Sequence, residues 1–251
     1  MGRFHTLANM FSFRHIIISF FILLCTAGMA QHSSTKIMNL GGFDNKAYHF
    51  GVQLSYNKSD FFVKRQFQPA FEDSILSLQH IGQPGFNIAI IASLNMTKNF
   101  SVRFIPGISP KERILSYSFL LPDGRALNYD KVLSSFYIDL PVNLKYRTDR
   151  INNFAAYVLV GTQLSRDMAS QENVNNERAG LEDQVVKIQR LDWLLNAGGG
   201  FDFFMPYFKF GLEFKMEYGL KNILIQDNTR FSGPLQSLYS RNFVLSFTFE
   251  G

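Results

Sequence analysis

Histidines are the first side chains of this sequence whose type and spacing could support catalysis or metal binding. His32, His49 and His80 lie beyond the N-terminal region, but none belongs to a His-x-x-x-His or Glu-x-x-His pair, so no metal site is predicted. His49 could activate Ser55 or a loop serine as the nucleophile of a lipid-acting hydrolase. We favour a packing role for His49, at the periplasmic mouth of the barrel lumen inferred below.

Two further motifs resemble chemical sites but have simpler interpretations. Glu213 and Glu217 could form an acid–base pair, yet Lys215 lies between them on one predicted strand, so these charges are expected to form a ladder. The glycine run 198–200 is no phosphate loop, because it lies within a predicted strand, where glycine relieves crowding or allows a bend. The sequence therefore predicts no catalytic residue, no metal, no cofactor and no enzyme activity.

Ten charged residues fall on the polar faces of predicted strands. They are Arg103, Asp139, Lys145, Arg190, Asp192, Asp202, Lys209, Glu213, Lys215 and Glu217. Five are cations and five are anions, and buried charges are costly unless they are paired. This balance predicts a structural ion-pair network that fills a lumen, and it argues against a conducting pore.

A two-residue alternation of large apolar residues with small or polar ones recurs along the chain, which is the pattern of a two-faced strand. Tyr48, Phe50 and Val52, for example, alternate with His49 and Gly51. Eight such segments occur, at residues 47–57, 86–94, 100–108, 136–146, 154–164, 190–203, 208–219 and 241–250. Their lengths suit the roughly 9–11 residues of a strand that crosses a bilayer.

The sixth and seventh segments predict a tight hairpin around Met205 and Pro206. A turn at residues 204–207 would place Asp202 opposite Lys209, Phe203 opposite Phe208, and Trp193 opposite Tyr218. Charges would then meet charges across the hairpin, and aromatic rings would meet aromatic rings.

The connections between the segments alternate in length. Long ones cover residues 58–84, 109–133, 166–185 and 222–240, and short ones lie near 97, 149–152 and 205–206. Within the second long connection, residues 113–121 still alternate, so the sheet is expected to extend beyond the membrane. Short periplasmic turns and long outer loops are typical of outer-membrane barrels. The predicted fold is all-β, an eight-stranded antiparallel up-and-down transmembrane β-barrel.

Residue size indicates which face of the strands meets lipid. Bulky Phe, Leu and Ile occupy one face, whereas Gly, Ser, Asn and paired charges occupy the other, as expected for a narrow eight-stranded lumen. A soluble ligand-binding barrel would reverse this arrangement. With 46% hydrophobic and 18% charged residues and a net charge of +5, the chain is neither disordered nor built to bind nucleic acid.

Aromatic residues gather toward the strand ends, as interfacial girdles do. The predicted girdle residues are Phe201, Phe203, Tyr207 and Phe208 on the turn side and Trp193 and Tyr218 on the loop side. The final strand alternates Phe243, Leu245, Phe247 and Phe249, and is expected to be the sorting strand that the outer-membrane assembly machinery recognises.

The first 30 residues have the pattern of a cleavable signal peptide. Arg3 and Arg14 precede an apolar run that is too short to span a bilayer as an anchor, and small residues precede a cleavage site between Ala30 and Gln31. Cleavage would remove Cys25, the only cysteine of the chain. The predicted organisation is a signal peptide at 1–30, a periplasmic N-terminal segment at 31–46 and an outer-membrane barrel at 47–251. The N-terminal segment could plug, tether or dangle.

Short motifs spread over the mature chain resemble the PorT family of Bacteroidetes outer-membrane proteins. They are Gln83–Phe86, Arg103–Pro106, Tyr137–Pro141, Lys145–Tyr146, Arg150–Asn153, Asp167–Ser170, Gly200–Phe203, Tyr207–Phe210, Gly219–Asn222 and Ser246–Glu250. The resemblance implies an accessory component of the type IX secretion system, which serves cargo export to the cell surface and in some bacteria gliding motility. It implies no catalytic residue and no cofactor.

The partners expected on this basis are outer-membrane lipid, the outer-membrane assembly machinery and other type IX secretion components. An eight-stranded barrel is too narrow to pass a folded protein, so the expected action is through protein–protein contacts. One alternative is a small structural or adhesive outer-membrane barrel with no secretion role. A lipid-modifying barrel enzyme that uses His49 is a more distant one.

Overall fold

The structure is a computed structural model that describes residues 38–65, 75–120, 124–176, 178, 180–227 and 229–251. The predicted signal peptide at 1–30, its cleavage site at Ala30 and Gln31, and residues 31–37 of the N-terminal segment lie outside these residues. Among the residues that the structure describes, no helix has the length and apolarity needed to cross a membrane.

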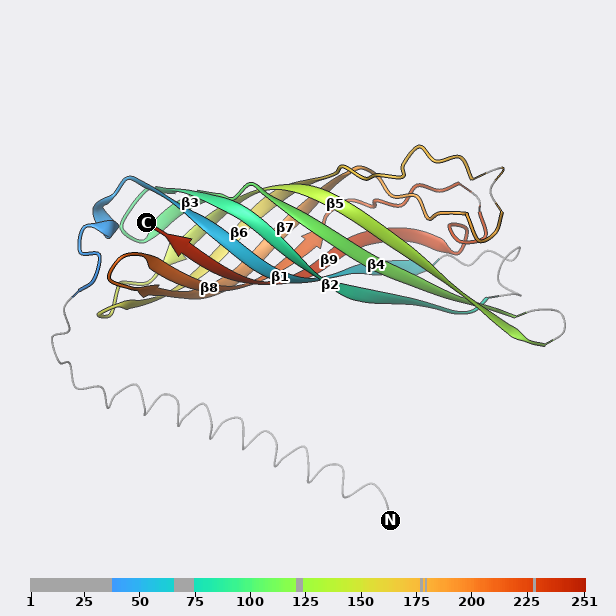
Figure 1. Ribbon diagram of the computed structural model, residues 1–251, viewed down its shortest axis with the longest axis horizontal. Helices are drawn as coiled ribbons and strands as arrows, with labels where there is room; N and C mark the ends of the chain where they lie inside the picture. Colours follow the sequence, from blue (N-terminus) through green and yellow to red (C-terminus); the bar gives the residue numbers. More distant parts are fainter. Residues whose placement is uncertain (1–37, 66–74, 121–123, 177, 179, 228) are drawn as a thin grey trace, which may run out of the picture. The chain divides into compact units, whose positions relative to one another are not determined.

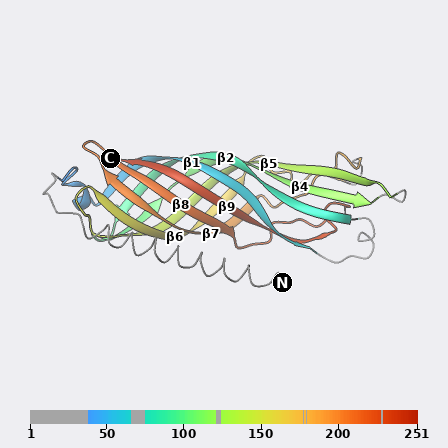
Figure 2. The ribbon, with the colours of Figure 1, turned by 90° about the horizontal axis from the view of Figure 1, so that it is seen from below.

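Nine antiparallel strands form one closed sheet (Figures 1 and 2). A short 3₁₀ helix, η1 (Phe43–Asn45), precedes them. The strands are β1 (Tyr48–Arg65), β2 (Ile75–Asn95), β3 (Phe100–Phe104), β4 (Gly107–Leu120), β5 (Ala126–Arg147), β6 (Phe154–Asp167), β7 (Leu191–Phe204), β8 (Lys209–Gly219) and β9 (Leu235–Glu250). Because β1 pairs with both β2 and β9, the sheet has no free edge along this seam.

The strands β3 and β4 act as one strand with an interruption at Ile105 and Pro106. Both pair with β2 on one side and β5 on the other, and Pro106 has no N–H to give to a ladder. The amide of Ile105 still donates to the carbonyl of Pro141 at 3.1 Å. With β3 and β4 taken together the barrel has eight strands, and the predicted eight-stranded up-and-down fold is confirmed.

The two faces of the wall have opposite chemistry. Large outward side chains such as Ile90 and Val158 are about 60% exposed, whereas the inward Asn57, Asn143 and Asn196 are fully buried. A soluble barrel would bury the large side chains instead. The structure therefore confirms that the apolar face points away from the lumen and that the polar face fills it.

An arginine in place of Val142 tests this outward face at the middle of β5. Val142 is an exposed residue in the centre of the apolar band, so Val142→Arg is expected to lower the free energy of unfolding in a bilayer by about 2–4 kcal/mol. Ser134→Arg, on the same face of β5 but beyond the band, should cost close to nothing. Urea titration of the barrel in lipid vesicles measures both, and an equal cost for the two variants would contradict a lipid-facing wall.

Two of the long connections expected from the sequence are mostly strand. β1 continues to Arg65 and β2 begins at Ile75, so the connection predicted at 58–84 shrinks to 66–74. β4 continues to Leu120 and β5 begins at Ala126, which confirms the predicted strand extension for its described residues, 113–120. Beyond the membrane the burial still alternates along β4, but the inward face becomes apolar at Leu115, Tyr117 and Phe119. The remaining long connections span residues 168–190 and 220–234.

The register predicted for the β7–β8 hairpin is wrong by two residues. Phe204 pairs with Lys209, so Asp202 lies opposite Gly211 and not opposite Lys209. Phe203 likewise pairs with Phe210 instead of Phe208, and Tyr218 with Leu195 instead of Trp193. The turn occupies residues 205–208 and is closed by a bond from the amide of Met205 to the carbonyl of Phe208. A slip of two residues keeps every side chain on its predicted face.

The strands rise beyond the apolar band into a second compact region, which we call the outer head. It comprises residues 57–65, 75–84, 109–120, 126–135, 168–190 and 220–242. Its buried apolar core consists of Phe61, Leu78, Leu115, Tyr117, Phe119, Leu133, Val186, Ile188, Ile223, Leu224, Phe231, Leu235 and Leu238. The two long connections pair with each other at Ile188 and Leu224, and so they close over this core.

Candidate functional site

The barrel lumen is filled by buried ion pairs whose centre is Arg103 on β3. The guanidinium of Arg103 lies 2.7 Å from a carboxylate oxygen of Glu213 on β8 and 3.5 Å from one of Glu250 on β9. The hydroxyl of Tyr157 on β6 donates to Glu213 at 3.0 Å. Lys209 approaches Glu250 at 3.1 Å, and His49 does so at 2.6 Å. Five strands are thus joined across the lumen by one cluster.

A second ion pair, between Lys145 and Asp202, lies beside this cluster, and its surroundings explain why residue 200 is a glycine. The ammonium of Lys145 is 2.8 Å from Asp202 and lies over the ring of Tyr157 at 3.5 Å. A Cβ atom at Gly200 would come within 2.7 Å of that ring and 2.3 Å of the carbonyl oxygen of Leu212. The prediction that the glycine run relieves crowding is confirmed at this position, where the inward Tyr157 needs the space.

Further ion pairs continue the network toward the outer head. Lys111 lies 3.4 Å from Asp139, whose carboxylate also accepts hydrogen bonds from the hydroxyls of Ser109 and Ser165. Lys215 lies 3.2 Å from Glu217 on the same strand, as the predicted ladder requires. The amide of Asn242 donates to Glu217 at 3.0 Å.

Nine of the ten charged residues predicted for the lumen are buried in it. They are Arg103, Asp139, Lys145, Asp192, Asp202, Lys209, Glu213, Lys215 and Glu217. The prediction is wrong for Arg190, because β7 begins only at Leu191 and the alternation of that strand does not reach it. The side chain of Arg190 is 42% exposed and lies 4.0 Å from Glu172 in the 168–190 connection.

Sequence reasoning missed several buried charged residues on the inward face, among them Glu250, Lys111 and Arg113. Glu250 ends the last strand on the same face as Asn242, Ser246 and Thr248, and this position in the alternation could have identified it. Lys111 and Arg113 are also buried and inward. Lys111 lies in a region that was predicted to be a loop, and Arg113 begins the predicted strand extension at 113–121, whose inward face was not assigned to the lumen.

The arrangement gives no support to a hydrolase pair. His49 is buried and contacts Glu250 and Lys209, whereas Ser55 donates to the hydroxyl of Ser246 at 2.9 Å. His49 and Ser55 therefore bind other residues, and the His–Ser hydrogen bond that a hydrolase would need is not formed. The predicted position of His49 at the periplasmic mouth is the observed one.

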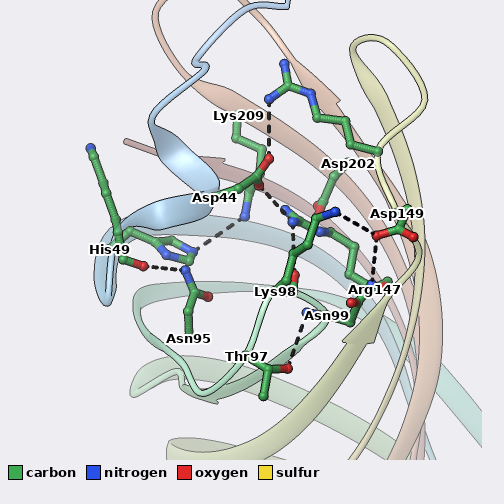
Figure 3. Close-up of polar contacts among 12 residues, drawn as sticks. Asp44, His49, Asn95, Thr97, Lys98, Asn99, Arg147, Asp149, Asp202 and Lys209 are labelled. Atoms are coloured by element: carbon green, nitrogen blue, oxygen red, sulfur yellow. Dashed lines mark hydrogen bonds and ion pairs between the residues drawn. The ribbon is translucent and has the colours of Figure 1, made fainter.

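Residues 38–46, which include η1, form a cap on this mouth, and we call them the periplasmic cap (Figure 3). Phe43 is buried, with its ring centroid 4.7 Å from that of His49 and 6.2 Å from that of Phe204. Asp44 binds Arg147 at 2.7 Å and Arg150 at 3.7 Å. The N-terminal segment was expected to plug, tether or dangle. The contacts of residues 38–46, its described part, are those of a plug.

Asp227 organises the loops of the outer head. Its carboxylate accepts hydrogen bonds from the hydroxyls of Ser232 at 2.6 Å and Thr229 at 3.0 Å and from the amide of Asn176, and Lys187 lies at 3.5 Å. Burial alone would raise the pKa of Asp227, but these hydrogen bonds and the lysine outweigh it and hold the pKa below its ordinary value. The two long connections are therefore tied together by a charged carboxylate.

This lowered pKa predicts a pH-dependent outer head. A depressed pKa in the folded state contributes stability that is full above about pH 4, the ordinary aspartate value, and is lost as pH falls through the lower folded value. We expect the hydrogen-exchange protection of the amides of Val185 and Ser232 to fall in that range. Asp227→Asn should give lower protection at pH 7 and no such step. An identical step in the variant would show that another group titrates.

The predicted girdle and sorting residues lie on the outer surface of the wall. Trp193, Tyr218, Phe201 and Phe208 are exposed, Phe203 is half-buried, and Tyr207 lies in the β7–β8 turn. On β9, Phe243 and Phe247 are exposed, and Phe249 lies 5.5 Å from Phe210 between ring centroids. The girdle and sorting roles of these residues stay predictions.

Three solved structures illustrate what the chain is distantly similar to. Neisserial surface protein A is 12% identical over 80% of this chain and 96% of its own, with a TM-score of 0.41. The outer membrane protein OprG of Pseudomonas aeruginosa is 13% identical over 81% and 95%, with a TM-score of 0.43. Ail, the attachment invasion locus protein of Yersinia pestis, is 12% identical over 82% and 100%, with a TM-score of 0.37.

The family comparison is more informative than these structures. No curated protein matches the chain significantly. The sequence pattern of the family described as outer membrane protein beta-barrel domain matches residues 29–224, well over half of the chain. This match supports the outer-membrane location and the barrel, and it gives no support to the finer resemblance to the PorT family. The chain belongs to the outer membrane protein beta-barrel domain family and is a protein of the outer membrane.

Proposed function

We propose that this protein is a structural or adhesive outer-membrane barrel that acts by contacts through its outer head and not by catalysis. The observation that carries this proposal is the separate apolar core of the outer head. A barrel needs only about 9–11 residues per strand to cross the membrane, whereas β1, β2 and β5 have 18, 21 and 22. The additional length supports a rigid external surface.

The filled lumen supports the same proposal. Most of its charged side chains, among them Arg103 with Glu213 and Lys145 with Asp202, are buried in ion pairs and fill the space that a reactive site or a water-filled path would need. Loops positioned by a rigid scaffold are the usual carriers of binding. In this barrel the loops at 168–190 and 220–234 are held by the apolar core and by Asp227. The outer head is therefore the part of the molecule best suited to meet a partner.

A variant with a trimmed outer head tests the proposal. Residues 171–187 and 222–232 would be replaced by short Gly-Ser connections, and retention of the barrel would be checked by its change of gel mobility on heating. We expect a gene-deletion strain that carries this variant to attach poorly to glass or to become sensitive to SDS. Loss of attachment alone indicates adhesion, and SDS sensitivity alone indicates a structural role. Behaviour like that of the full-length protein in both assays would contradict the proposal.

The second candidate is the accessory role in type IX secretion that the PorT resemblance implies. One observation favours it, the ordered periplasmic cap, which gives the protein a defined surface on the side where cargo would arrive. Deletion of the gene should then abolish surface display of cargo while other outer-membrane proteins persist. Normal cargo export in the deletion strain would remove this candidate and leave the first one standing.

A further inference from the structure

The lipid-facing wall carries a groove of about 460 Å³ across β7, β8, β9 and β1, which lie side by side in Figure 2. Two rows of outward residues, aligned by the strand register, mark its course. One row is Ala197, Met216, Phe243 and Lys58, and the other is Gly199, Phe214, Leu245 and Tyr56. All of these except Gly199 line the groove, together with Gly198, Lys215 and Val244, which occupy the alternate, lumen-facing positions of their strands.

Small residues on β7 create the hollow. Most outward positions of the wall carry Phe, Leu, Ile, Val or Tyr, but on this strand Ala197 and Gly199 stand in succession between Leu195 and Phe201. Across the two neighbouring strands the bulky Phe214 and Phe243 rise on either side of the channel. Neighbouring strands lie about 4.8 Å apart, so the three intervals from β7 to β1 give the groove a length of about 14 Å.

The β1 end of the groove carries a cation without an acidic partner. Lys58 is the first polar outward residue after the apolar run of β1, which ends at Tyr56, so it marks the outer boundary of the apolar band. Its side chain is exposed, and within the described part of the chain no carboxylate lies in ion-pair distance. The neighbouring Arg241 is already bound to Asp60 at 3.0 Å, and Asp60 also binds His80.

We propose that this groove binds an acyl chain of an anionic lipid of the outer leaflet, whose phosphate pairs with the ammonium of Lys58. The lining is apolar, and the groove opens onto the surface that lipid covers. A lysine at the edge of a bilayer extends its ammonium to the headgroup level while its methylenes stay along apolar surface. The site therefore joins an apolar hollow for part of an acyl chain to a headgroup cation, and it selects for negative charge at one end.

The binding test uses the purified full chain in detergent with phosphatidylglycerol or phosphatidylcholine as the probe. Native mass spectrometry should show one retained phosphatidylglycerol per barrel. Lys58→Gln is expected to weaken that binding about fivefold and to leave phosphatidylcholine unchanged. Arg166→Gln, on the outward face at the outer end of β6 and away from the groove, is the matched control and should change neither. Equal retention of both lipids by the native chain would overturn the proposal.

A second variant tests the acyl-chain part of the site. Ala197→Phe fills the groove from the lipid side and should abolish retention of either lipid, whereas Val142→Phe, on the exposed wall of β5, should not. Both variants must show the native change of gel mobility on heating. If Ala197→Phe does not show it, Ala197→Leu takes its place. Retention by the groove-filled barrel equal to that of the Val142→Phe control would overturn the proposal.

Discussion

Arg103→Ala is expected to lower the free energy of unfolding of the barrel by about 3–5 kcal/mol. The guanidinium of Arg103 is the cation that Glu213 and Glu250 share near the periplasmic mouth of the lumen, and all three side chains are buried. Removing it leaves two carboxylates in a low-dielectric space with one positive partner fewer. The loss arises mainly from this uncompensated charge, because truncation of one partner of a buried pair costs far more than the pair itself contributes.

Urea titration in lipid vesicles measures this loss, and the heating temperature at which the gel mobility changes should fall with it. Arg166→Ala is the matched control, because Arg166 is an exposed arginine at the outer end of β6. The double variant Arg103→Met/Glu213→Gln should recover part of the loss, since it removes one charge of each sign. Equal stability of Arg103→Ala and Arg166→Ala would show that the lumen is hydrated and that its charges are not in a buried network.

Phe231→Ala is expected to destabilise the outer head by about 3–5 kcal/mol while the membrane part of the barrel stays closed. The ring of Phe231 is fully buried and lies 5.1 Å from that of Tyr117, 5.9 Å from that of Phe119 and 5.8 Å from that of Tyr129. The ammonium of Lys131 lies over the ring of Phe231, 4.2 Å from its centroid. The substitution removes the ring around which the two long connections are folded and leaves a cavity in the core of the outer head.

Limited proteolysis of the outer head separates this local effect from global unfolding. Cleavage in residues 168–190 should become much faster in Phe231→Ala, with no change in the heating temperature that shifts the gel mobility. Phe62→Ala removes the same atoms from a ring that is 38% exposed on the outer surface of β1, and should leave cleavage close to native. A loss of the heat-resistant form together with the loops would instead show that the outer head and the barrel unfold as one unit.

The membrane-spanning part of the fold was predictable because lipid and a filled lumen impose opposite chemistry on alternate residues. That constraint identified the inward position of Asp202 and Glu213 and the outward position of Phe214 without any structure. It has a period of two, and so it could not detect the two-residue error in the β7–β8 register. It also stops at the edge of the lipid, and this is why Arg190 was assigned to the lumen and why the outer-head strands, apart from the extension predicted at 113–121, were predicted to be loops.

The candidate site was predictable as a set of charges but not as a set of pairs. Sequence placed Lys209 opposite Asp202, whereas in the barrel Lys209 binds Glu250 and Asp202 binds Lys145. Partners across a lumen come from strands that are distant in sequence, and their meeting depends on the stagger of the closed sheet, which no local pattern records. The outer-head core was missed for the same reason, since Phe61 and Phe231 meet only after the loops fold over.

The cluster around Glu250 also bears on how the barrel is assembled. Each hairpin joins neighbouring segments, but the seam between β1 and β9 brings together His49 and Glu250, which are about two hundred residues apart in the chain. Contacts of such separation carry the largest loop-closure cost and form late. Until they form, the open sheet has two unpaired edges, and the carboxylate of Glu250 lacks its partner His49. Closure of the seam satisfies the edges and the charges in the same event, which makes the last step of folding cooperative and disfavours half-closed intermediates.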